Sequence, residues 1–92
     1  MSEIIIRRRH DKSLAEARTA AEHMAGELQE EFGLDYAWDG NRMRFKRPGV
    51  TGELTLDEKE VSLSIRLGLL LFAVKPAIER AAHRYFDENF PV

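Results

Sequence analysis

The sequence predicts an α+β fold: a two-layer sandwich in which two helices cover one face of an antiparallel sheet. Three observations predict it. A helical stripe of apolar residues follows an extended first segment, four alternating segments occupy the middle of the chain, and a second helical stripe follows them. The predicted order is therefore β-α-β-β-β-β-α. Because each alternating segment has one apolar and one polar side, we expect the sheet to be covered on one face only.

The first two predicted elements are a strand and a helix. The segment from Glu3 to Arg9 starts with β-branched residues and then becomes basic, which is typical of a strand whose far end reaches solvent. Ser13 and Glu16 have the spacing of a capping box, so a helix is expected to begin there, and Gly33 can adopt the left-handed conformation that ends a helix. The apolar stripe of this helix of about 20 residues consists of Leu14, Ala17, Ala21, Met24, Leu28 and Phe32.

The next four segments form a predicted meander of strands. After Gly33, apolar residues recur at every second position, which is the spacing of a strand with one buried face. Asp39-Gly40 is a hairpin signal, and Pro48-Gly49 and the segment from Asp57 to Glu60 mark the other two turns. The inward side of the meander is expected to hold Leu34, Tyr36, Trp38, Met43, Phe45, Val50, Leu54, Leu56, Val61, Leu63, Ile65 and Leu67.

The last predicted element is a second helix. Pro76 would break a helix interior but is tolerated in a first turn, where the backbone N–H has no partner, so the helix is predicted to start near Phe72. Charged residues surround a single apolar stripe, so this helix is expected to pack with one face on the sheet. The stripe consists of Ile78, Ala81, Ala82, Tyr85 and Phe86.

Length and composition predict one globular domain over residues 1–92. The net charge of −2 provides no global field that would attract nucleic acid or an anionic membrane. The absence of cysteine excludes disulfides, thiolate catalysis and cysteine zinc sites. The longest apolar stretch, residues 67–74, is far below the ~20 residues that cross a bilayer, and no secretory signal is recognised, so a cytoplasmic location is expected.

Several of these segments also carry a family resemblance. It covers nearly the whole chain, from the strand that ends in Arg9-His10, through Phe32-Gly33-Leu34, Trp38-Asp39-Gly40 and the stretch FKRPGVTG, to Ile78-Glu79-Arg80. In these features the sequence resembles the polyhydroxyalkanoic acid system family. The resemblance implies a setting in bacterial storage-polyester synthesis and granules, but it implies no assigned molecular activity and transfers no catalytic or ligand-binding residue.

The sequence does not predict an enzyme. His10, His23 and His83 lie at a strand end and on two different helices, outside the spacings that direct two imidazoles at one metal, and each is interpreted as a solvated or hydrogen-bonded surface histidine. Ser62 and Ser64 alternate outward in a regular strand, without the glycine-flanked turn that presents a serine nucleophile. No catalytic residue, metal or cofactor is therefore expected.

Two clusters are candidate interaction surfaces, and the first is basic. It consists of Arg42, Arg44, Lys46 and Arg66, which could merge with the run Arg7 to Arg9 on the uncovered sheet face if the strands are neighbours. One hypothesis is a nucleic-acid or anionic-partner platform; the other is a solvated face with counter-charges such as Glu53. The second is favoured, because the aromatic residues of these strands share the inward side and cannot stack on bases.

The second cluster is apolar and consists of Leu69, Leu70, Leu71 and Phe72. These side chains could enter the hydrophobic surface of a granule or a membrane interface. Alternatively they are the buried end of a strand and the first turn of the last helix, and burial is favoured because short apolar runs between turns are usually core. Eight consecutive residues exceed what one face can hide, so one or two side chains could serve a homodimer contact.

We therefore expect a non-enzymatic binding or scaffolding protein that is linked to polyhydroxyalkanoate granules. Its expected partners are the granule surface or granule-associated proteins, which would place it in the cytoplasm at granules. The alternative is a module that binds nucleic acid or another anionic partner through the basic sheet face.

Overall fold

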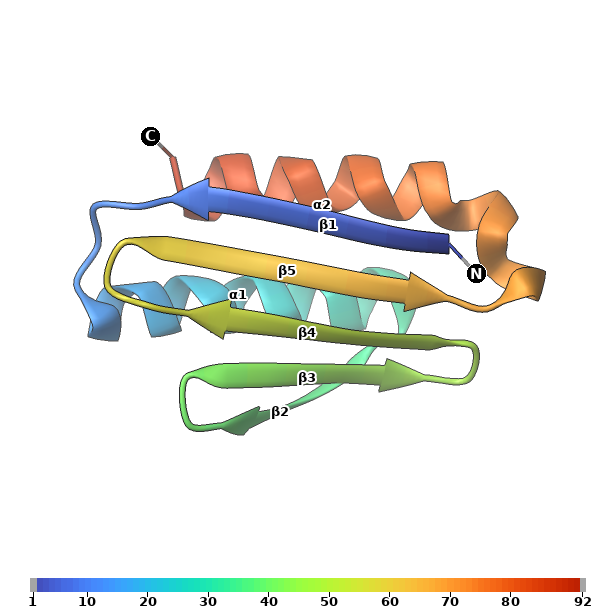
Figure 1. Ribbon diagram of the computed structural model, residues 1–92, viewed down its shortest axis with the longest axis horizontal. Helices are drawn as coiled ribbons and strands as arrows, with labels where there is room; N and C mark the ends of the chain where they lie inside the picture. Colours follow the sequence, from blue (N-terminus) through green and yellow to red (C-terminus); the bar gives the residue numbers. More distant parts are fainter. Residues whose placement is uncertain (1, 92) are drawn as a thin grey trace.

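The computed structural model describes residues 2–91, without the side chains of Ser2 and Leu70. It has two layers, a five-stranded sheet and a helical layer, and it confirms the predicted α+β sandwich and the order of its strands and helices (Figure 1). The elements are β1 (Ser2–Arg9), α1 (Leu14–Phe32), β2 (Asp35–Asp39), β3 (Arg42–Arg47), β4 (Val50–Leu56), β5 (Glu60–Leu67), the 3-10 helix η1 (Leu69–Val74) and α2 (Lys75–Asn89).

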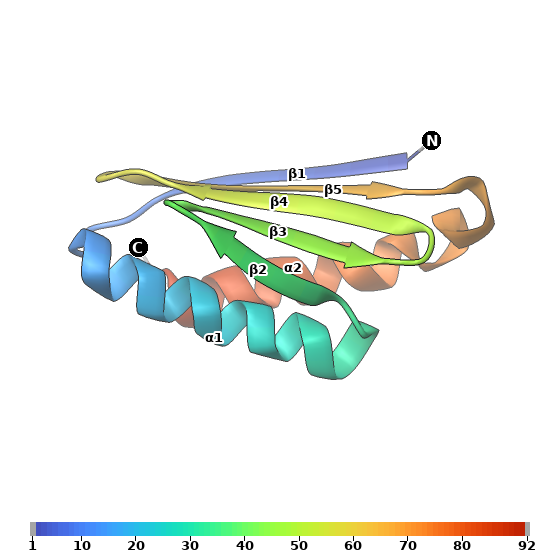
Figure 2. The ribbon, with the colours of Figure 1, turned by 90° about the horizontal axis from the view of Figure 1, so that it is seen from below.

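The sheet is antiparallel throughout, with the strand order β1-β5-β4-β3-β2. The four strands from β2 to β5 form the predicted meander, and β1 joins it beside β5 at the edge opposite β2. Figure 2 shows both helices on the same side of the sheet, which leaves the other face open. The strand order therefore places two strands, β5 and β4, between the basic end of β1 and β3.

One hydrophobic core lies between the sheet and the helices, and the alternation of the strands explains it. Residues of one parity point into the core and residues of the other parity reach solvent, as in β3, where Met43 and Phe45 are buried while Arg42 and Arg44 are exposed. Tyr36 and Trp38 pack partly buried against the same core. The aromatic residues of the meander thus face the helices, as predicted.

The boundaries of α1 follow from its two caps. The Ser13 side chain accepts the backbone N–H of Glu16 at 3.2 Å, and the Glu16 carboxylate accepts the N–H of Ser13 at 3.1 Å, which is the predicted capping box. The hydrogen bond from the Ser13 backbone N–H to the carboxylate, helped by the Ser13 side chain, holds the pKa of Glu16 below its ordinary value. Gly33 ends the helix with a φ of 70°, in the left-handed region that only glycine adopts without a steric penalty.

The last helix begins later than predicted. Helix α2 starts at Lys75, not near Phe72, because the six residues before it form the separate 3-10 helix η1. Gly68 has extended backbone angles and its carbonyl accepts the N–H of Leu71 at 3.0 Å, which starts the tighter turn. Pro76 occupies the first turn of α2, as expected, and η1 carries the chain from the sheet layer to the helical layer.

Candidate functional site

The 3-10 helix η1 forms one end of the molecule and exposes apolar side chains there. It lies beyond the ends of the strands, at the right-hand end of the long axis in Figure 1. Leu69 is 74% exposed, Phe72 is 63% exposed and Val74 is 42% exposed, values that are uncommon for large apolar residues gathered in one short segment. These three residues are called the apolar apex below.

The geometry of a 3-10 helix explains which side chains face outward. With three residues per turn, residues i and i+3 lie one above the other. Leu69 and Phe72 therefore form an outer row, whereas Leu71, which is partly buried, and Val74, which is half-exposed, form a second row. Leu71 packs partly buried against the core, and Gly68 donates its N–H to the carbonyl of Gly49 at 2.8 Å. The segment is thus anchored on one side and open on the other.

The apolar cluster is divided by the structure, which corrects the expectation that it is buried. Leu67 is fully buried at the end of β5 and Leu71 is partly buried, but Leu69 and Phe72 are exposed. The side chain of Leu70 lies outside the described residues. The physical reason is that η1 bridges the two layers at their end, where no further described element covers its outer side.

The apex is also poor in charge. Between Leu67 and Ile78 the only charged residue is Lys75, and its side chain is partly buried at the start of α2. The segment contains no carboxylate. An apolar surface could therefore cover the apex without desolvating an acidic group, which would be costly.

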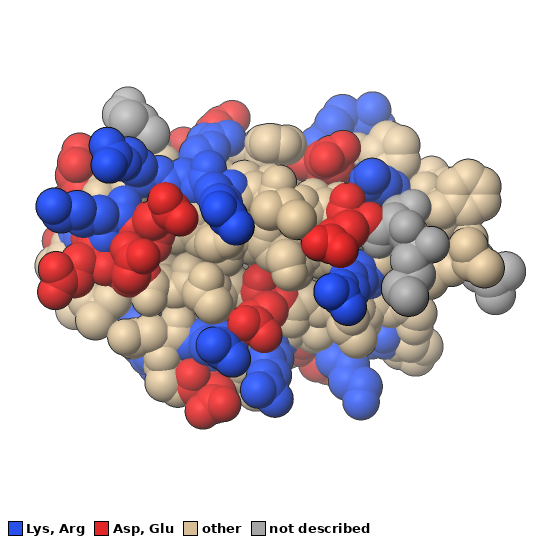
Figure 3. All heavy atoms as spheres, in the orientation of Figure 1, with Lys and Arg blue, Asp and Glu red and all other residues tan. Residues whose placement is uncertain are grey.

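The second candidate surface, the open sheet face, carries its basic residues among acidic ones. Arg42 and Arg44 are exposed on β3, yet Arg42 Nε lies 3.1 Å from Glu53 Oε1 and Arg44 Nη2 lies 3.9 Å from Asp39 Oδ2. Arg66 on β5 is separated from β3 by β4, and its Nε lies 3.6 Å from an oxygen of Glu3. Figure 3 shows blue and red side chains interspersed over this face. The face is mixed in charge.

The basic run of β1 does not merge with this cluster. Arg7 and Arg9 point to the open face at the edge strand, with β5 and β4 between them and β3. Arg8 points to the helical layer, where it lies over the ring of Phe86 and its Nη1 donates to Asp87 at 2.6 Å. The alternation of the strand therefore divides the three arginines between two faces.

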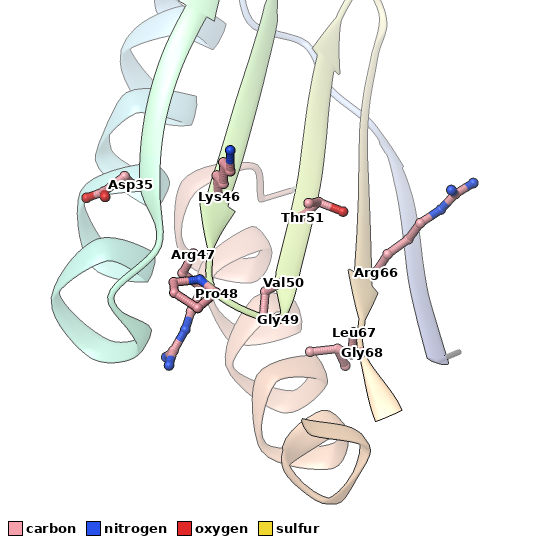
Figure 4. A pocket seen from close by; sticks show the side chains of 10 residues that line it. All are labelled: Asp35, Lys46, Arg47, Pro48, Gly49, Val50, Thr51, Arg66, Leu67 and Gly68. Carbon is pink, nitrogen blue, oxygen red and sulfur yellow. The ribbon is translucent and has the colours of Figure 1, made fainter. Parts of the chain in front are cut away.

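A shallow depression of about 720 Å³ lies beside Lys46, Thr51 and Arg66 (Figure 4). The register places these residues in one row across three neighbouring strands, with Thr51 between the two cations. In Figure 4 the Arg66 side chain points away from Lys46. The two cations therefore do not converge on a single anion.

The three histidines are separated and each makes its own hydrogen bonds. His10 is buried, which corrects the prediction of a surface residue: Lys12 donates its N–H to His10 Nδ1, and His10 Nε2 lies 3.0 Å from the carbonyl oxygen of Asp57. His23 lies 2.9 Å from Oδ1 of Asn89, and His83 faces Arg8. Within residues 2–91, no group of three His, Cys, Asp or Glu residues is arranged to hold a metal ion.

Within the same range, no helix is long and apolar enough to cross a membrane.

Comparison with known proteins identifies a family. A family model described as "Putative polyhydroxyalkanoic acid system protein" matches residues 4–90. Neither the comparison with curated proteins nor the comparison with solved structures gave a significant match. The family match runs from within β1 to the end of α2 and thus includes all of the strands and helices except the first two residues of β1. The chain therefore belongs to the polyhydroxyalkanoic acid system protein family.

Proposed function

We propose that this protein is a non-enzymatic binding or scaffolding component of the polyhydroxyalkanoate system that attaches to the granule surface through the apolar apex. The observation that carries the proposal is the outward row of Leu69 and Phe72 on η1. The family supports it, since a protein of the polyhydroxyalkanoic acid system would meet a storage polyester, and exposed leucine and phenylalanine side chains gain free energy by contact with an apolar surface. A cytoplasmic location at granules follows from this proposal.

The energy of such a contact is suited to reversible attachment. Burial of one leucine or phenylalanine side chain contributes about 1.5–3 kcal/mol, so the outer row contributes about 3–6 kcal/mol. A free energy of about 4 kcal/mol corresponds to a dissociation constant near 1 mM. A single apex would thus hold one molecule weakly, and stable coverage would require a second contact, such as a granule-associated protein.

The backbone of the apex supports contact with an apolar phase. The N–H of Leu71 donates to Gly68 and the N–H of Lys75 donates to the carbonyl of Phe72, so these backbone groups are already paired. Unpaired backbone groups would oppose transfer from water into an apolar environment. The apex therefore exposes large apolar side chains, and some of its backbone N–H groups already donate hydrogen bonds within the segment.

The scaffolding part of the proposal rests on the position of the apex. Because η1 lies at one end of the long axis, a molecule attached there keeps its open sheet face in water (Figure 1). That face carries paired charges of both signs and would remain accessible to a soluble protein. We therefore infer that granule-associated proteins bind to the open face.

Co-sedimentation with purified granules tests the attachment. Leu69→Glu and Phe72→Glu place a carboxylate in the outer row, and each is expected to shift most of the protein from the granule pellet to the supernatant. Leu14→Glu is the matched control, because Leu14 is a partly exposed apolar residue in the first turn of α1, where a carboxylate is favourable. Equal amounts of all variants in the pellet, or wild-type protein wholly in the supernatant, would overturn the proposal.

A further inference from the structure

Behind η1 lies an apolar hollow of about 350 Å³ that no pattern in the sequence predicts. It is formed by the end of α1, the turn between β3 and β4, the inner side of η1 and the first turn of α2. Its apolar lining consists of Phe32, Leu34, Val50, Leu71, Val74, Ala77 and Ile78. Among the residues that the structure describes, the polar side chains that line it are those of Glu31 and Arg47.

The two rows of side chains on η1 differ in their contact with this hollow. Leu71 and Val74, the inner row, contribute to its wall, whereas Leu69 and Phe72 do not line it. Leu34, Val50 and Ile78 are buried residues of the core that line the hollow. The hollow and the outer row are thus distinct surfaces of one segment, and variants can test them separately.

Arg47 gives the hollow a single available positive charge. Its side chain lies on the helical side of the sheet, and its Nη1 donates to the carbonyl of Phe32 at 2.7 Å, which fixes the guanidinium near the end of α1. Within residues 2–91, no carboxylate oxygen lies within 4.0 Å of an Arg47 nitrogen. The other charged residue, Glu31, lies 3.4 Å from Arg84 Nη2. The charge of Arg47 is therefore not neutralised by a neighbouring acid.

We propose that this hollow binds an aliphatic chain that ends in a carboxylate, with the chain against the apolar wall and the carboxylate on Arg47. A guanidinium offers two parallel N–H donors to a carboxylate, which gives both charge and orientation. The volume is near the lower end of the roughly 300–1,000 Å³ that is usual for small-molecule sites, so it fits one chain and not a large cofactor.

This inference extends beyond granule attachment and does not depend on it. The same chemistry has two possible sources: a free aliphatic or hydroxy acid, and the carboxyl end of a polyester chain. Both present a carboxylate on an aliphatic stem, so the experiment must distinguish them by length.

Titration of the protein with octanoate, followed by methyl NMR, tests the site directly. We expect shifts at the methyl groups of Leu34, Val50 and Ile78, and none at Ile4, which lies in the core of β1 away from the hollow. Arg47→Gln is expected to weaken octanoate binding at least tenfold and to change the binding of methyl octanoate, which lacks the charge, by less than twofold.

A second variant blocks the hollow without removing the charge. Ala77 lines the hollow from the first turn of α2, so Ala77→Phe is expected to abolish the binding of both probes while the Ile4 methyl signals stay unchanged. Phe72→Glu is expected to keep octanoate binding, so a failure of granule attachment and a failure of this site are distinguishable.

Comparison of 3-hydroxyoctanoate with a short oligomer of it that has a free carboxyl end then identifies the source. Tighter binding of the oligomer assigns the polyester end, and tighter binding of the monomer assigns the free acid. The proposal is overturned if neither these probes nor octanoate shift the methyl groups of the hollow, or if Arg47→Gln weakens octanoate and methyl octanoate equally.

Discussion

Gly49 and Leu71 are in direct contact, and this contact packs η1 against the turn between β3 and β4. A Cβ atom at Gly49 would lie only 2.8 Å from Cδ1 of Leu71, closer than real Cβ atoms approach another heavy atom. Gly49 also has a φ of 82°, and its carbonyl accepts the N–H of Gly68. The turn between β3 and β4 is therefore shaped to receive the inner row of η1.

Gly49→Ala is expected to destabilise the protein by about 1–2 kcal/mol, since a positive φ costs a residue with a Cβ about that much, and the added Cβ also displaces the end of the Leu71 side chain. Chemical denaturation measures this. Gly26→Ala is the matched control: Gly26 lies inside α1 with no atom within 4 Å of the added Cβ, so stability should rise by roughly 0.5–1 kcal/mol. Equal effects of both substitutions would contradict this account of the turn.

His10→Ala is expected to lower the free energy of unfolding by about 1–3 kcal/mol, because it removes a buried side chain that links Lys12 to Asp57. The loss should appear in denaturant midpoints. His83 is exposed, and its Nδ1 lies 3.4 Å from Arg8 Nη2. His83→Ala should therefore leave the denaturation midpoint nearly unchanged. A larger loss in the His83 variant would show that His10 is not the structural histidine.

Tyr85 gives a prediction at alkaline pH. Burial of its phenol, together with the Glu31 carboxylate, raises the pKa of Tyr85 to about 12. An unfolded tyrosine has a pKa of about 10, so the neutral phenol stabilises the fold fully below pH ~10, and this contribution is lost as the pH rises towards 12. Tyrosinate absorbance should show a step near pH 12 that is absent in Tyr85→Phe. If the tyrosinate absorbance of Tyr85→Phe follows the same pH curve as that of the wild type, the step near pH 12 does not belong to Tyr85.

The mixed charge of the open face predicts weak interaction with nucleic acid. Arg42, Arg44 and Arg66 each have a carboxylate within 4.0 Å, so wild-type protein should not retain a single-stranded oligonucleotide at about 0.1 M salt. Electrophoretic mobility measures this. Salt-sensitive binding by the wild type that Arg44→Gln weakens would instead support the nucleic-acid hypothesis for this face.

Local patterns in the sequence were sufficient to predict most of the fold. The capping box of Ser13 and Glu16, the terminal Gly33 and the alternation of the strands each depend on a few neighbouring residues. The order of β1 in the sheet could not be predicted in this way, because it depends on contacts between distant segments. The position of β1 is what separates its arginines from those of β3.

The candidate site was less predictable than the fold. A run of apolar residues is compatible with burial or exposure, and only the end position of η1 leaves Leu69 and Phe72 uncovered. The start of α2 was missed because no side chain caps it, so no capping signal separates it from the 3-10 helix. The hollow beside Arg47 has no sequence pattern, since its lining comes from four separate segments.

The most direct measurement of attachment uses an environment-sensitive fluorophore on a single cysteine. The chain contains no cysteine, so Phe72→Cys and Leu14→Cys each give one labelling position, the first on η1 and the second in the first turn of α1 at the opposite end (Figure 1). On addition of purified granules, the label at position 72 is predicted to shift its emission to the blue and the label at position 14 is predicted to stay unchanged. Unchanged emission at position 72, or an equal shift at both positions, would contradict attachment through the apolar apex.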